Sequence, residues 1–78
     1  MTVQTIAARV DARGLSCPLP IVKTALAIRG LASGDLLEVL ATDPGSTKDF
    51  TAWSTTTGHT LVESSVDGAV FRYLVRRK

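Results

Sequence analysis

The stretch PLPIVKTALAIRG, residues 18–30, decides the fold that this sequence predicts. Its apolar residues recur three and four positions apart, which is the spacing of a helix. Two prolines stand at its start, where a missing N–H removes no helical hydrogen bond, and Gly30 is typical of a helix end. We therefore predict a helix that begins at Pro18 and stops at Gly30. Its apolar residues are Leu19, Val22 and Leu26, with Ile21, Ala25 and Ile28 beside them.

Segments on both sides of this helix predict strands and a second helix. Residues 4–11 (QTIAARVD) and residues 36–42 (LLEVLAT) are typical of strands, and each of them ends before a turn. The turn at residues 43–46 leads into a second helix, with Ser46 as N-cap, Asp49 three residues later and Thr57-Gly58 as its end. Residues 59–66 and 69–77 predict two further strands joined by Asp67-Gly68.

The order βαβαββ predicts an α/β (α+β) two-layer sandwich in a single domain, residues 1–78. Two helices are expected on one face of a four-stranded mixed sheet, with the first two strands parallel and the last two antiparallel. The strand residues expected to face the helices are Leu37, Val39, Ala41, Phe71, Tyr73 and Val75. The opposite phase stays open, because the alternate positions include Leu36, Leu40, Val70 and Leu74. A sheet apolar on both faces suggests that a partner covers the second face.

Composition limits the possible functions. One cysteine in 78 residues excludes an intramolecular disulfide, and the sequence has no Cys/His cluster that predicts a metal site or cofactor. It shows no signal peptide and no apolar run of the ~20 residues that a membrane span needs, so we expect a soluble, cytoplasmic protein. The net charge is +2, with four basic residues crowded into positions 72–78. Such a tail suits an acidic partner, RNA phosphates or simply solvent.

Cys17 is the candidate reactive group. If the helix begins at Pro18, Cys17 is its N-cap, where amides from Leu19 onward and the helix dipole favour a thiolate. Arg13 and Lys23 are candidates for electrostatic support. The alternative is an inert thiol, because free cysteines often act as small buried hydrophobes.

The absence of a second cysteine excludes thioredoxin-like exchange. A cysteine hydrolase needs a base beside the thiol, and nothing in the sequence brings the only histidine, His59, to Cys17. A solitary activated thiol can, however, accept sulfur from a persulfide donor and pass it on.

Residues 10–20, VDARGLSCPLP, resemble LDARGLxCPxP, the hallmark of the TusA/SirA-like sulfur-carrier family. The resemblance continues through TDPGSTKDF (42–50), GHTLVES (58–64) and FRYLVRRK (71–78). It implies a fold like the C-terminal domain of translation initiation factor three. It also implies a sulfurtransferase that acts as a protein-bound persulfide carrier, with the persulfide on Cys17. The motif and helix start then comprise Gly14, Pro18, Leu19 and Pro20.

The resemblance also implies protein partners. A cysteine desulfurase or rhodanese would donate sulfur to a protein acceptor in tRNA thiolation, molybdenum cofactor assembly or sulfur oxidation. Docking is expected beside the turn at Asp43 and Pro44, with Arg29 and Lys48 as further candidates. Leu19 stands where the tRNA-thiolating members have Glu, which weakens the link to tRNA without altering the sulfur chemistry.

A rival interpretation is a non-catalytic RNA- or protein-binding module that uses the basic C-terminal strand. It draws on fold analogy alone, and fold does not imply function. The sequence has no GXXG loop and no RNP aromatics, so direct nucleic-acid binding is not expected.

Overall fold

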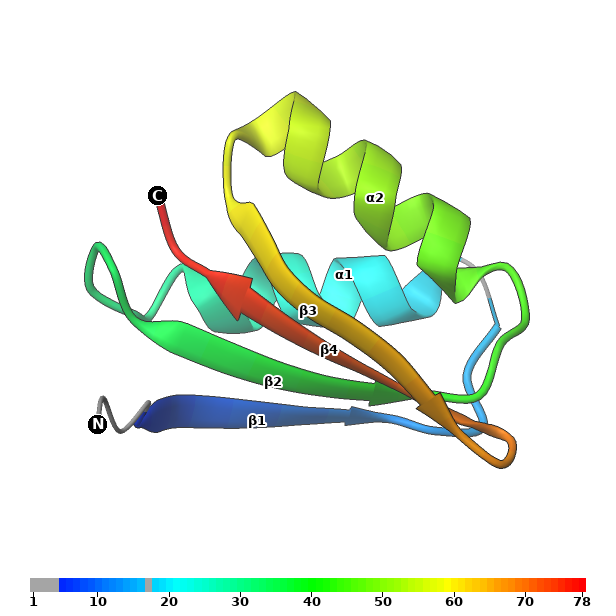
Figure 1. The fold of residues 1–78 in the computed structure, drawn as a ribbon. Helices are drawn as coiled ribbons and strands as arrows, with labels where there is room; N and C mark the ends of the chain where they lie inside the picture. Colours follow the sequence, from blue (N-terminus) through cyan, green and yellow to red (C-terminus); the bar gives the residue numbers. More distant parts are fainter. Residues whose placement is uncertain (1–4, 17) are drawn as a thin grey trace.

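The computed structural model describes residues 5–16 and 18–78. Its elements are β1 (Ile6–Ala12), α1 (Leu19–Ile28), β2 (Leu36–Ala41), α2 (Ser46–Thr57), β3 (Thr60–Asp67) and β4 (Val70–Arg76) (Figure 1). This is the predicted order βαβαββ. Within the described ranges, no helix is long and apolar enough to cross a membrane.

The four strands form one mixed sheet in the order β1-β2-β4-β3. As predicted, β1 and β2 are parallel and β3 and β4 are antiparallel, while β2 pairs antiparallel with β4. Both helices lie on the same face of the sheet, so the fold has two layers (Figure 1). The predicted fold class is confirmed.

The core lies between the sheet and the helices. Of the residues expected to face the helices, all but Phe71 are completely buried, and Phe71 packs against the core half-buried. Phe50 of α2 stacks on Tyr73 of β4, with ring centroids 4.5 Å apart. The Tyr73 hydroxyl is hydrogen-bonded to Ser46 Oγ at 2.6 Å and Thr47 Oγ1 at 2.9 Å. These contacts join α2 to the sheet.

The opposite face of the sheet is not the apolar surface that we expected. Glu38 of β2 lies at its centre and accepts from Arg9 Nε at 2.9 Å and Arg72 Nε at 2.7 Å. Arg72 also reaches Glu63 of β3 at 3.4 Å. Leu36 and Leu74, also on this face, are only 4% exposed each within the chain itself. The apolar second face, on which the expectation of a covering partner rested, is therefore not present.

Several element ends differ from prediction by one or two residues. Gly45, not Ser46, is the N-cap of α2, because the Ser46 hydroxyl turns toward Tyr73. The helix α1 ends at Ile28, before Gly30, whereas α2 ends as predicted at Gly58, whose left-handed φ of 85° suits glycine. The β3–β4 turn consists of residues 68 and 69, because Asp67 still pairs with Val70.

Candidate functional site

The loop that carries the predicted motif lies where β1 and β2 end together. Because these strands are parallel, the β1–α1 and β2–α2 connections emerge at the same edge of the sheet (Figure 1). The Gly14 N–H donates to Thr42 Oγ1 at 2.9 Å and ties the two connections together. Gly14 has a φ of 80°, which explains the glycine at this turn. Cys17 itself lies outside the described residues, and the site is defined by the residues around it.

The start of α1 differs from the predicted N-cap geometry. The helix begins at Leu19 with Pro18 as its N-cap, so Cys17 precedes the cap. The Leu19 N–H is already donated to the Ser16 carbonyl at 2.9 Å, and Val22 N–H to the Pro18 carbonyl at 3.1 Å. Prolines 18 and 20 have no N–H. At most the Ile21 amide of the first turn is left for an anion, so the expected row of donors from Leu19 onward is absent.

Arg13 and Lys23, the expected electrostatic supports, both contact Asp11 at the end of β1. Arg13 Nε and Nη2 donate to the two Asp11 carboxylate oxygens at 2.8 and 2.9 Å. These bonds, with the Arg13 backbone N–H, hold the pKa of Asp11 at about 2, well below its ordinary value. Lys23 Nζ donates to the Asp11 carbonyl at 3.2 Å. Since Arg13 and Asp11 cancel, Lys23 supplies the net positive charge here.

The structure brings only some of the docking candidates together. The Asp43 carbonyl accepts the Ser46 N–H at 3.0 Å in the β2–α2 turn, at the same edge as the motif loop. Lys48 follows on the exposed first turn of α2. Arg29 is the C-cap of α1, about 15 Å along the helix axis from its start. Arg29 therefore belongs to the other end of the molecule.

An exposed apolar stripe on α1 is the feature that sequence reasoning missed. Leu19, Val22 and Leu26 are 49%, 46% and 61% exposed, although their spacing is what predicted the helix. The buried face carries Pro20, Thr24 and Ile28 instead. Thr24 is tolerated there because its hydroxyl donates to the Pro20 carbonyl at 2.8 Å. The stripe begins next to the motif loop.

His59 is not at this end of the molecule. It lies beside Ile28 and Arg29, at the opposite end of α1 from the Ser16–Pro18 segment. Its position gives no support to a cysteine hydrolase that would use His59 as base. Across residues 5–16 and 18–78, no group of three or more His, Cys, Asp or Glu residues is placed to hold a metal ion.

A family model described as Sulfurtransferase TusA matches residues 8–77. The chain belongs to the TusA family. The sulfur carrier protein TusA of Allochromatium vinosum is 46% identical over 68 residues, which cover 87% of this chain and 90% of that protein. The TusA of Pseudomonas putida strain F1 is 40% identical over 78 residues, which cover 100% of this chain and 98% of that protein.

A solved structure shares the fold. The crystal structure of a SirA-like protein from Desulfitobacterium hafniense matches with a TM-score of 0.78, covering 88% of this chain and 95% of that one. The two sequences are 22% identical, so this likeness supports the architecture alone.

Proposed function

We propose that this protein is a cytoplasmic sulfur carrier in which Cys17 alternates between a thiol and a persulfide. The observation that carries the proposal is the match of residues 8–77 to the TusA family, whose curated relatives are named sulfur carrier proteins. Cys17 is the only cysteine of the chain, and it immediately precedes the N-cap of α1.

The proposed transfer is a thiolate exchange without net redox change. The Cys17 thiolate attacks the sulfane sulfur of a donor persulfide, a new S–S bond forms at Cys17, and the donor cysteine leaves as a thiolate. In the second step an acceptor thiolate attacks the outer sulfur, and Cys17 leaves as a thiolate. A single cysteine suits this cycle, because a neighbouring resolving thiol would discharge the persulfide as hydrogen sulfide.

The surroundings of Cys17 favour an anion through charge more than through hydrogen bonds. The positive end of the α1 dipole and the Lys23 ammonium lie on this side, and cations and helix N-termini lower thiol pKa values. A Glu at position 19 would repel a thiolate at Cys17, and the uncharged Leu19 does not. Two prolines and the Ser16–Leu19 hydrogen bond stiffen the segment on either side of Cys17.

We propose that the exposed stripe of Leu19, Val22 and Leu26 contacts a donor or acceptor protein. The Asp43 turn lies at the same end of the sheet as the motif loop, where the stripe begins. Replacing Leu26 by Asp should slow sulfur transfer from a protein donor at least tenfold, because buried apolar anchors contribute about 2 kcal/mol or more at interfaces. Loading from polysulfide, which needs no docking, should not change. The rate is measured with a purified cysteine desulfurase and cysteine.

The matched control is Val62→Asp, because Val62 is also an exposed apolar residue but lies in the first half of β3, toward the end of the sheet away from the motif loop. It should transfer sulfur at the wild-type rate. If Leu26→Asp and Val62→Asp behave alike, the stripe is not the docking surface.

Intact-mass measurement tests the carrier function itself. The reduced protein is incubated with polysulfide or thiosulfate, or with a desulfurase and cysteine, and then weighed. We expect a gain of one or two sulfur atoms that a reductant reverses. No adduct from any of these donors would refute the proposal.

The structure gives little support to the rival binding module. The basic residues near the C-terminus do not form one surface: Arg72 is paired with Glu38 and Glu63 on the open face, whereas Arg77 donates to the Leu31 carbonyl beside the end of α1. A binding module should retain its binding when Cys17 is replaced, and a carrier should lose all transfer.

A further inference from the structure

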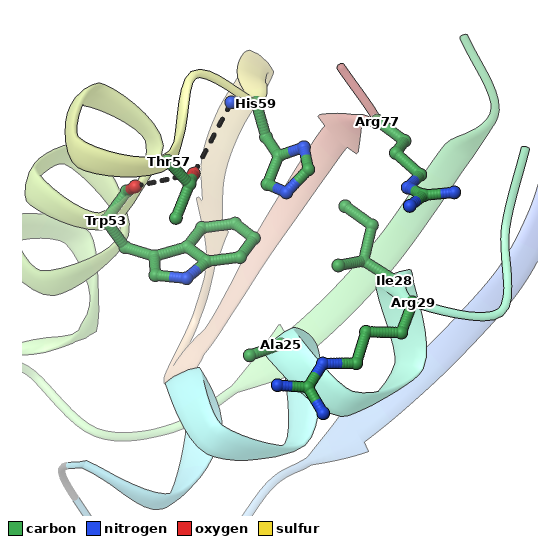
Figure 2. Close-up of a pocket in the computed structure, with 7 residues that line it drawn as sticks. All are labelled: Ala25, Ile28, Arg29, Trp53, Thr57, His59 and Arg77. Carbon is green, nitrogen blue, oxygen red and sulfur yellow. Dashed lines mark hydrogen bonds between the residues drawn. The ribbon is translucent and has the colours of Figure 1, made fainter. Parts of the chain in front are cut away.

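A pocket of about 220 Å³ lies at the end of the molecule opposite the motif loop. It is open to solvent on one side and is lined by residues at the C-terminal ends of α1 and α2, by His59 before β3 and by Arg77 after β4 (Figure 2). Its apolar part comes from Ala25, Ile28 and the Trp53 indole, and its polar part from Arg29, Arg77 and His59. The Arg29 side chain comes from the α1 side and the Arg77 side chain from the end of β4, with Ile28 between them (Figure 2).

The side chains that line the pocket carry positive charge. None of the described residues that line it is acidic. In the part of the chain that the structure describes, the arginines with ion-pair partners are Arg9, Arg13 and Arg72, all outside the pocket. Arg77 donates through Nη1 to the Leu31 carbonyl, which fixes its direction and leaves other N–H groups available, because a guanidinium has five donors. The lining can therefore bind an oxyanion through charged donors.

His59 adds a neutral donor to this lining. Its Nδ1 accepts the Lys78 backbone N–H at 3.0 Å, so the neutral ring carries its proton on Nε2. Burial first, and then the charges of Arg77 and Lys78, lower the pKa of His59 and favour this neutral form. In Figure 2 the imidazole stands over the pocket between Trp53 and Arg77. The Trp53 and His59 ring centroids are 5.3 Å apart. Both rings line the pocket.

We propose that this pocket binds a small planar organic anion, namely a single ring that carries a carboxylate. The guanidinium groups and His59 Nε2 would hold the carboxylate, and the ring would lie against Trp53 and the apolar residues of α1. The size fits this class, because about 220 Å³ is below the roughly 300–1,000 Å³ of pockets that take drug-sized ligands. An Arg side chain favours a carboxylate, because one planar guanidinium can bind one carboxylate in bidentate fashion.

The site is separate from the proposed sulfur chemistry. Cys17 precedes α1, whereas the pocket residues of α1 lie about 9–15 Å along the helix axis from the start of the helix. The Cys17→Ser protein should therefore bind the anion as the wild type does. A failure of sulfur loading and a failure of anion binding can thus be told apart.

Fluorescence of Trp53, the only tryptophan of the chain, provides the test. The whole protein is titrated at constant ionic strength with benzoate, with neutral benzamide and with inorganic phosphate. We expect a saturable change with benzoate, none with benzamide, and weaker binding of phosphate. Proton NMR should show that bound benzoate raises the pKa of His59, because a nearby anion stabilises the imidazolium.

Variants assign the binding to the pocket. Arg29→Gln should weaken benzoate binding at least about tenfold, because a hydrogen bond to a charged group contributes about 1.5–3 kcal/mol. Arg76→Gln removes an equal charge from the exposed end of β4 outside the pocket and should bind like the wild type. The proposal is overturned if benzoate produces no saturable change, if benzamide or phosphate binds as well, or if the two variants bind benzoate equally.

Discussion

Cys17→Ser protein will take up no sulfur from polysulfide, thiosulfate or a desulfurase with cysteine. The hydroxyl that replaces the thiol cannot form a stable persulfide, and the chain has no other cysteine to substitute for it. The expected effect is complete loss, not a reduced rate. It is measured as the intact mass after each incubation, beside the wild type.

Ser16→Ala is the matched control for this variant. Ser16 is exposed and contributes its backbone carbonyl, not its side chain, to the hydrogen bond from Leu19. Ser16→Ala should therefore load sulfur like the wild type, and both variants should retain wild-type circular dichroism. Sulfur uptake by Cys17→Ser would mean that the sulfur is bound elsewhere and that the proposed function is wrong.

Phe50→Ala will lower the free energy of unfolding by about 3–5 kcal/mol, as expected for an aromatic side chain lost from a packed core. Phe50 is completely buried, stacks on Tyr73 at 4.5 Å and meets the Trp53 ring edge-on at 6.1 Å. These contacts join α2 to the sheet. Urea unfolding followed by circular dichroism gives the value.

Thr55→Ala, on the exposed side of the same helix, controls for changes in helix propensity. It should alter the free energy of unfolding by less than about 0.7 kcal/mol. If Phe50→Ala costs no more than Thr55→Ala, the aromatic stack is not what fastens α2 to the sheet.

The fold was predictable from the sequence because helical and strand-like segments alternate along the chain and turn residues separate them. Residues 18–30 have helical spacing, whereas β2 and β4 are short segments rich in apolar and β-branched residues. The orientation of the sheet was harder, because both phases of β2 and β4 are apolar. The aromatic pair of Phe50 and Tyr73 resolves it, since only the phase of Tyr73 meets α2.

The candidate site was less predictable, for physical reasons. The helix α1 is apolar nearly all round, so spacing alone does not reveal that Leu26 is exposed and Thr24 is buried. The buried Thr24 hydroxyl is satisfied by a hydrogen bond to the Pro20 carbonyl of its own helix. The composition of the segment does not reveal this bond, because it depends on the helix geometry. The Glu38 network likewise depends on which strands become neighbours. The pocket around His59 forms because the C-terminal ends of α1, α2 and β4 meet in space. No local sequence motif predicts that meeting.

The most direct test of the central claim is to locate the transferred sulfur and follow its departure. Trypsin cleaves after Arg13 and Lys23 and releases residues 14–23, which contain Cys17. The protein is loaded by a cysteine desulfurase, separated from it, and alkylated before and after exposure to an acceptor thiol. We predict an added sulfur on peptide 14–23 that disappears upon transfer. A peptide 14–23 of unchanged mass, or sulfur retained after exposure to the acceptor, would contradict it.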